Sequence, residues 1–246
     1  MYYDNLDSCF SKYLEDKNII KVNNFQKQKK DIDVSKIEEQ IEIINEFHNR
    51  MIGYTGHMNK RLTNSLGRTV EQYKIYIKWL SRDIDRIKHN GSNTEFEEIL
   101  ENKGEDYLDR ANKCIEDIYN NNYIHLLKRS MVRNEVCLKN VYFNNLRKVE
   151  DVIQVINING CSYNMIEMDE VNFLKKLKKK ILNMDPSRFV LKFCDISNLD
   201  KDSFKFIISM YNYPYEFMKC CNKYRYKREL IGEEECVNEL KKIVQT

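Results

Sequence analysis

The sequence predicts a mainly α-helical protein with a small β insert, an α+β fold. Only 7 glycines and 2 prolines occur in 246 residues, so few residues are present that end helices or form sharp turns. Apolar residues recur at helical spacing along most of the chain, and several of these segments begin with a capping box. One segment, residues 137–158, reads instead as two short apolar strands around a polar loop.

The first 34 residues carry the weakest pattern and are predicted to form a short N-terminal appendage. Residues 6–14 favour a short helix, and residues 19–22 favour a strand. The helical body is predicted to cover residues 35–246. It begins with a capping box at Ser35 and Glu38, in which the hydroxyl and the carboxylate each satisfy a free backbone N–H group.

Each later helical pattern is expected to bury one apolar face. Further capping boxes at Thr69 and Thr94 support two of these helices. The expected helices cover residues 37–51, 70–87, 94–100, 108–118 and 123–130, and those after the β insert begin at Asp169, at Pro186, at Asp200 or Asp202, at Pro214 and near Glu233.

Composition excludes several classes of function. Charged residues make up 32% of the chain but nearly cancel to a net charge of +3, so we expect no nucleic-acid partner. No apolar run is long enough to span a membrane, and the first residues lack a secretory signal. The eight cysteines form no C-x-x-C pair, which argues against a zinc or redox motif. We expect reduced thiols and synthesis in the cytoplasm.

Other chemical groups allow both a structural and a functional interpretation. Five lysines lie between residues 175 and 180; they suit the solvated face of an amphipathic helix, and an anion-binding surface is the alternative. His48 falls on a helix face beside Phe47, where we expect a packed or hydrogen-bonded imidazole. Glu150 and Asp151 are expected to be solvated residues of a hairpin turn. The C-terminal tyrosines suit core packing or intermolecular contacts.

Several short segments carry a resemblance to a known family through their order and spacing. They are EFHN at 46–49, GY at 53–54, LGR at 66–68, VCLKNVYFNN at 136–145, VININGC at 155–161, DEVNFL at 169–174, and YPYEF and NKY at 213–217 and 222–224. Their order resembles the C-terminal lobe of the CotS-type spore coat proteins, which belong to the aminoglycoside/choline phosphotransferase branch of the protein-kinase-like fold. The resemblance covers about residues 37–244.

The departures from this family concern its catalytic groups. Active relatives carry His-Gly-Asp and, five residues later, Asn; the Asp accepts the proton of the substrate hydroxyl and the Asn helps hold Mg²⁺. In this sequence Asn140 replaces that Asp, and a neutral amide is no carboxylate base. Asn145 matches the metal-site Asn, but Asn157 replaces the second metal ligand, an Asp. The resemblance gives Asp169 a structural role, which we assign to capping the helix that follows.

The resemblance therefore implies a pseudokinase, with no catalytic residue, no cofactor and no metal. It also implies that most of the N-terminal lobe is missing, because residues 1–34 contain no glycine and one candidate strand. We expect a structural or scaffolding protein of the spore coat, made in the mother cell, with other coat proteins as partners and possible homo-oligomers. The alternative is a weak small-molecule phosphotransferase that uses ATP and Mg²⁺ and needs a partner to bind the nucleotide.

Overall fold

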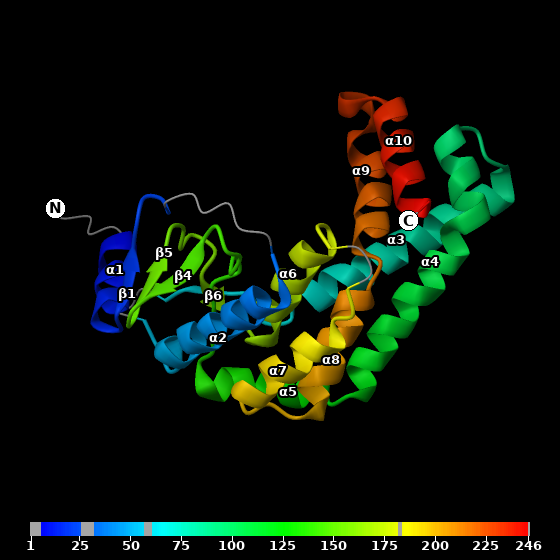
Figure 1. Cartoon of the computed structure of the whole chain (residues 1–246). Helices are drawn as coiled ribbons and strands as arrows, with labels where there is room; N and C mark the ends of the chain where they lie inside the picture. The colour runs from blue at the N-terminus through cyan, green and yellow to red at the C-terminus, as the bar shows by residue number, and fades with distance from the viewer. Residues whose placement is uncertain (1–5, 26–31, 57–60, 182–183, 246) are drawn as a thin grey trace. The chain divides into compact units, whose positions relative to one another are not determined.

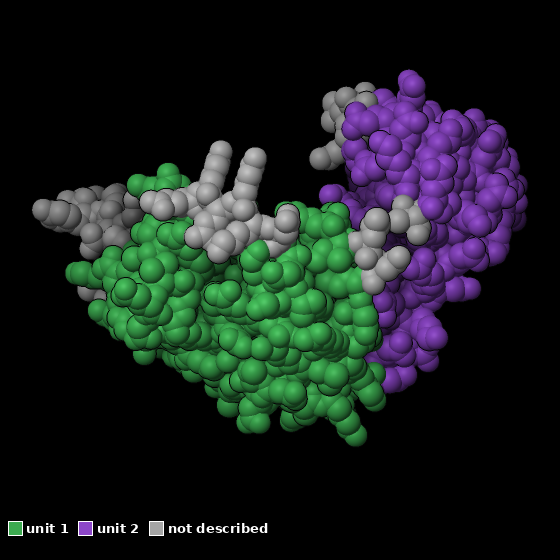
Figure 2. Space-filling model, viewed as in Figure 1, with its two compact units in different colours: residues 1–66, 121–211 green, residues 67–120, 212–246 purple. Residues whose placement is uncertain are grey.

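The computed structural model describes residues 6–25, 32–56, 61–181 and 184–245, which form two compact units. Unit 1 comprises residues 1–66 and 121–211, and unit 2 comprises residues 67–120 and 212–246 (Figure 2). The chain leaves unit 1 after residue 66, builds part of unit 2, returns at residue 121 and enters unit 2 again at residue 212. None of these three boundaries coincides with the predicted division at residue 34.

A three-stranded sheet in unit 1 has the strand order β1-β5-β4 (Figure 1). β5 (Val152–Val155) lies in the middle, parallel to β1 (Ile19–Lys21) and antiparallel to β4 (Leu146–Val149). Residues 150 and 151 form the turn of the β4–β5 hairpin, and Glu150 has a positive φ of 54°. The predicted turn at Glu150 and Asp151 and the strand after it are therefore present, but residues 147–149, which we expected in the turn, belong to β4. β1 is the strand that we expected at residues 19–22, and it joins the same sheet.

A second small sheet has the order β2-β6-β3. β6 (Ser162–Tyr163) pairs in parallel with β2 (Thr63–Asn64) and antiparallel with β3 (Val136–Cys137). The two apolar segments that we expected in a single insert thus belong to different sheets. The polar loop between them, residues 138–145, connects β3 of one sheet to β4 of the other.

The helices of unit 1 pack around these sheets. α2 buries an apolar face that includes Ile37, Ile41 and Phe47. Its N-cap is Asp33, which accepts a hydrogen bond from Lys36 N at 2.9 Å, so the capping box predicted at Ser35 is wrong by two positions. The helices of this unit are α1 (Leu6–Asp16), α2 (Val34–Met51), α5 (Tyr123–Arg133), α6 (Glu167–Lys178), α7 (Ser187–Ile196) and α8 (Lys201–Asn212).

Unit 2 consists of α3 (Arg68–Asn90), α4 (Glu95–Asn120), α9 (Tyr215–Ile231) and α10 (Glu233–Val244). α4 unites the two helices that we expected at residues 94–100 and 108–118. Gly104 lies in the part of α4 between those two predicted helices, and it packs against α3. A Cβ atom at Gly104 would come within 3.0 Å of Ile84 Cδ1. A glycine normally weakens a helix, and here it permits two helices to approach closely.

Aromatic stacking fills the interior of unit 2. The rings of Tyr73 and Tyr213 are 3.7 Å apart, and those of Phe96 and Tyr224 are 3.9 Å apart. All four residues are buried, which agrees with core packing. In the part of the chain that the structure describes, no helix is both long enough and apolar enough to cross a bilayer.

Candidate functional site

The loop after β3 is held in place by the carboxylate of Asp169. Asp169 Oδ2 accepts a hydrogen bond from Leu138 N at 2.8 Å, and Asp169 Oδ1 accepts one from Lys139 N at 2.7 Å. Asp169 lies inside the first turn of α6, which begins at Glu167. Its structural role is therefore to anchor the loop, and our assignment of Asp169 as the cap of the following helix is wrong.

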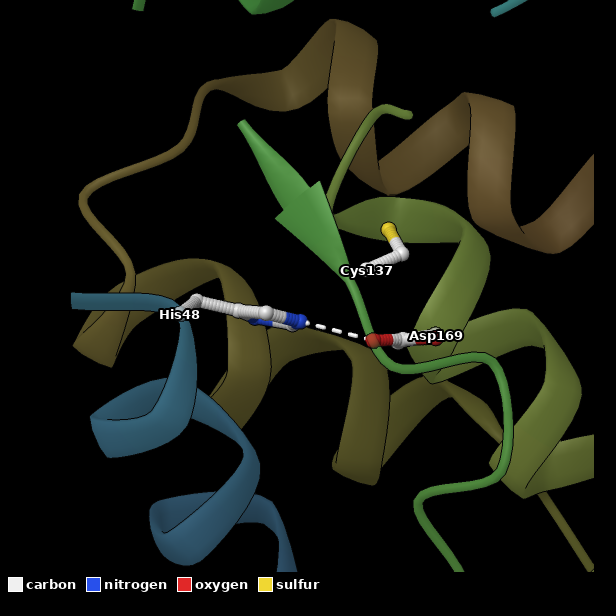
Figure 3. Close-up of side chains that lie close together, drawn as sticks. All are labelled: His48, Cys137 and Asp169. Atoms are coloured by element: carbon white, nitrogen blue, oxygen red, sulfur yellow. Dashed lines mark hydrogen bonds and ion pairs between the residues drawn. The ribbon is translucent and has the colours of Figure 1, made fainter. Parts of the chain in front are cut away.

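His48 of α2 completes this anchor. Its Nε2 atom lies 3.0 Å from Asp169 Oδ2, and the two side chains are 2% and 0% exposed (Figure 3). The imidazole is thus packed and hydrogen-bonded, as predicted. The pair joins α2, α6 and the loop after β3 in one buried contact.

Cys137 adjoins the same pair, and the three residues have the chemistry of a metal centre. One ligand atom from each of His48, Cys137 and Asp169 lies within 4.8 Å of the others. A metal-bound cysteine must be a thiolate. Burial, and next the charge of Asp169, raise the pKa of the Cys137 thiol, which donates a hydrogen bond to Met165 O at 3.0 Å. Both oxygens of Asp169 already accept backbone hydrogen bonds. This arrangement favours a hydrogen-bonded clamp over a metal site.

The side chain of Asn145 forms hydrogen bonds with the backbone of Asn140 and Asn157, the other two asparagines that the sequence analysis identified. Its Nδ2 atom donates to Asn140 O at 2.7 Å and to Asn157 O at 3.0 Å. Its Oδ1 atom accepts from Asn157 N at 2.8 Å, and the residue is 2% exposed. Every polar atom of this amide is therefore used to tie the loop to the end of the β5 segment.

The side chains of the other two asparagines are directed elsewhere. Asn140 Oδ1 accepts a hydrogen bond from Lys176 Nζ on α6. Asn157 Oδ1 accepts one from Asn159 N at 2.8 Å, two residues further along its own loop. The structure brings all three positions together through the backbone, whereas the side-chain oxygens of Asn140 and Asn157 have separate partners.

Acidic residues elsewhere in unit 1 have other roles. Asp151 lies in the β4–β5 turn with an 82% exposed side chain, and its backbone oxygen accepts from Arg50 at 3.0 Å, in agreement with its prediction as a solvated turn residue. Glu135 and Glu167 are fully buried and bind Arg129 of α5 at 3.2 Å and 2.8 Å. These two carboxylates join helices in the core, and neither is free to act as a base.

Glu170 is a buried acid that the sequence analysis missed. The residue is 0% exposed, and neither carboxylate oxygen has a hydrogen-bond partner among the described residues. Burial, and next the charge of Asp169, raise its pKa well above the ordinary value. Desolvation of this kind disfavours the charged form of the carboxyl group. The spacing of apolar residues in this helix did not predict that Glu170 is buried, because a glutamate is normally assigned to the solvent-facing side of a helix.

The seven described cysteines are all buried and form no disulfide bond. Burial raises the pKa of the Cys194 and Cys220 thiols to about 12. These residues therefore behave as small core side chains, the role expected of most cysteines in the sequence.

A solved structure shares this architecture. It is the crystal structure of an aminoglycoside phosphotransferase from Alicyclobacillus acidocaldarius subsp. acidocaldarius DSM 446, which matches with a TM-score of 0.66 and 11% sequence identity. The chain has a kinase-like, aminoglycoside-phosphotransferase-like fold. The match covers 85% of this chain and 61% of that chain, so the chain spans less than two thirds of the neighbour's length. No protein-family model matches, and no curated protein matches.

The comparison confirms the predicted fold class, a mainly helical chain with small sheets and an aminoglycoside-phosphotransferase-like fold. The finer resemblance to CotS-type spore coat proteins stays a prediction, as does the absence of most of an N-terminal lobe.

Proposed function

We propose that this chain is a catalytically inactive, phosphotransferase-like protein. The observation that carries the proposal is the chemistry of the loop after β3. In the order of elements that the resemblance implies, residues 140, 145 and 157 hold the base and the metal ligands. All three are amides here, and the amide of Asn145 is fully engaged by backbone groups.

The two replacements of Asp by Asn, at residues 140 and 157, remove two separate requirements for phosphoryl transfer. The base must accept a proton from the acceptor hydroxyl, and an amide oxygen is far too weakly basic for this. Mg²⁺ is a hard cation that prefers charged oxygen ligands, and a neutral amide binds it poorly. Asp169, a fully buried acid that contacts the same loop, already accepts or shares three hydrogen bonds, with His48 and with the backbone of Leu138 and Lys139.

The biological role we propose is structural or scaffolding, in assembly of the spore coat. It rests on the resemblance to CotS-type proteins alone. In this role the chain is made in the mother cell, joins other coat proteins, and can associate with copies of itself. Fractionation tests it: an antibody to the chain should detect it in extracted spore coats. Recovery only from the soluble fraction of vegetative cells would contradict the role.

A phosphotransfer assay tests inactivity. The full chain is incubated with Mg-ATP and a panel of amino-alcohol and sugar acceptors, and we expect no acceptor-dependent release of ADP. The double variant Asn140→Asp/Asn157→Asp, which restores both carboxylates, is assayed beside it. Turnover by the unmodified chain that is lost in Asn145→Ala would overturn the proposal.

The second candidate is a weak small-molecule phosphotransferase that obtains nucleotide binding from a partner. The observation that favours it is the hydrogen bonding of the loop, which Asp169 and Asn145 hold at both ends. Binding of ATP and Mg²⁺ would raise the melting temperature by mass action. We expect no Mg²⁺-dependent shift with ATP for the isolated chain. A shift that appears only in the presence of Mg²⁺ would favour the enzyme.

A further inference from the structure

Two lysine side chains reach the loop after β3: Lys176 in the last turn of α6, and Lys180 two residues beyond the end of that helix. Lys176 Nζ donates a hydrogen bond to Asn140 Oδ1 and lies 5.6 Å from the centroid of the Tyr142 ring. Lys180 follows four residues later, and its Nζ atom lies 4.8 Å from the centroid of the same ring. Two ammonium groups therefore gather at one aromatic ring, beside the residue that occupies the position of the catalytic base.

Neither ammonium group is neutralised in the described part of the chain. No carboxylate there lies within ion-pair distance, 4.0 Å, of Lys176 or Lys180. Burial, and next the charge of Lys180, lower the pKa of Lys176. Like charges held close together repel each other. The chain thus holds together two cations that repel each other, and an anion bound between them would relieve that repulsion.

A third lysine lies on the same loop in a costly backbone conformation. Lys139 has a positive φ of 70°, a left-handed backbone conformation that is strained for a non-glycine residue. Its side chain is exposed and lies over Gly160: a Cβ atom at Gly160 would come within 3.2 Å of Lys139 Cβ and 3.4 Å of Lys139 Cδ. A glycine would adopt this φ without strain, so the backbone conformation itself does not favour a lysine at this position.

We propose that Lys139, Lys176 and Lys180 form a site for the phosphate group of a small molecule, and that this site needs no metal ion. Lysine ammonium groups are strong point charges that bind phosphate oxygens. Here they supply the positive charge that Mg²⁺ supplies in a phosphotransferase. The hydroxyl group of Tyr142, the ring that both lysines approach, is a further hydrogen-bond donor. It is buried and has no hydrogen-bond partner among the described residues.

This inference goes beyond the proposed function, because an inactive protein can bind a phosphate compound without turning it over. It also differs from the expectation that these lysines are only the solvated face of a helix. Lys178, on the same helix as Lys176, contacts a different ring: its Nζ atom lies 4.7 Å from the centroid of the Tyr211 ring. Lys176 and Lys180 instead point to the loop.

Isothermal titration of the full chain with inorganic pyrophosphate, in the presence of EDTA, tests the site. We expect binding without metal, weakened by rising salt because the contact is ionic. The variant Lys176→Met/Lys180→Met should lose affinity by about tenfold or more. The control Lys178→Met removes one charge from the same helix and should bind as the unmodified chain does.

Lys139→Gly supplies a second, independent variant. It removes a charge and relieves the positive φ, so it should raise the melting temperature while it weakens pyrophosphate binding several-fold. Loss of affinity in this variant cannot be attributed to misfolding. Absence of binding to the unmodified chain, a strict need for Mg²⁺, or an equal loss in Lys178→Met would each overturn the proposal. Phosphotransfer in the separate assay would overturn the proposed inactivity and leave this site unaffected.

Discussion

The side-chain amide of Asn145 forms two hydrogen bonds with the backbone of Asn157: Oδ1 accepts from Asn157 N at 2.8 Å, and Nδ2 donates to Asn157 O at 3.0 Å. With the third bond, to Asn140 O, this one residue connects both ends of the site. An amide suits the position because it offers a donor and an acceptor together, which no carboxylate does.

We expect Asn145→Asp to lower the free energy of unfolding by about 2–4 kcal/mol, because a carboxylate oxygen would replace the donor that faces two carbonyl groups. Urea denaturation measures the change. Asn144→Asp is the matched control: Asn144 is the exposed neighbour, and its substitution should change stability by less than about 0.5 kcal/mol. Equal stability of the two variants would show that the hydrogen bonds of Asn145 are unimportant.

Asp169→Ala should destabilise the protein by about 3–5 kcal/mol, since it leaves the backbone N–H groups of Leu138 and Lys139 without their buried acceptor. Asp195→Ala, at an exposed position of α7, provides the control. Hydrogen exchange adds a local measurement, because the amides of residues 138 and 139 should lose protection first. Unchanged protection at these two amides would contradict the anchoring role.

Arg129→Met should cost about 3–5 kcal/mol, because it removes the guanidinium group that the buried carboxylates of Glu135 and Glu167 share. Among the described residues, Glu135 keeps Arg133 as an ion-pair partner at 3.4 Å, and Glu167 keeps the Ser203 hydroxyl at 2.6 Å. The Arg129 guanidinium group also donates to Ser203 Oγ at 3.1 Å, so the loss extends to α8. Lys128→Met removes the same charge from the exposed neighbouring position and should be nearly neutral. Similar melting temperatures for the two variants would mean that this ion network adds little to stability.

Glu170→Gln should stabilise the protein increasingly as the pH rises. The folded-state pKa of Glu170 is raised, so above about pH 4.5 the unfolded chain loses this proton while the folded chain keeps it. Wild-type stability therefore falls with rising pH, by up to about 1.4 kcal/mol per pH unit, until the folded-state pKa is reached. The variant lacks this contribution.

Denaturation at about pH 4 and about pH 8 measures the effect. The two proteins should differ least at the lower pH, where the carboxyl group is protonated in both states. Glu234→Gln, at an exposed position of α10, should show no such trend. A stability difference that does not change with pH would mean that Glu170 is ionised in the folded protein.

The seven described cysteines should resist a thiol reagent in the native protein and react fully in denaturant, because all are buried. Peptide mapping after alkylation identifies the protected positions. Rapid native labelling of Cys137 would show that its segment opens readily and that its thiol is more acidic than its burial implies.

Local pattern was enough to predict the helical class, the turn at Glu150 and Asp151 with the strand that follows it, and the hydrogen-bonded state of His48. Apolar spacing identifies the face that a helix buries, and a short strand, turn and strand identifies a hairpin. The sequence also singled out Asn140, Asn145 and Asn157, through a family resemblance rather than through chemistry visible in the residues themselves. The exact helix starts were less predictable, since Asp33 and Ser35 are both good caps.

Tertiary structure alone decided what those residues contact. His48 and Asp169 are 121 positions apart, and Asp169 and Leu138 are 31 apart, so no helical or strand period connects them. The same holds for Lys176 and Asn140, and for β1, whose place beside β5 depends on a partner far along the chain. Sequence spacing specifies the faces of single elements, whereas the burial that forces polar groups to find partners arises only when those elements pack.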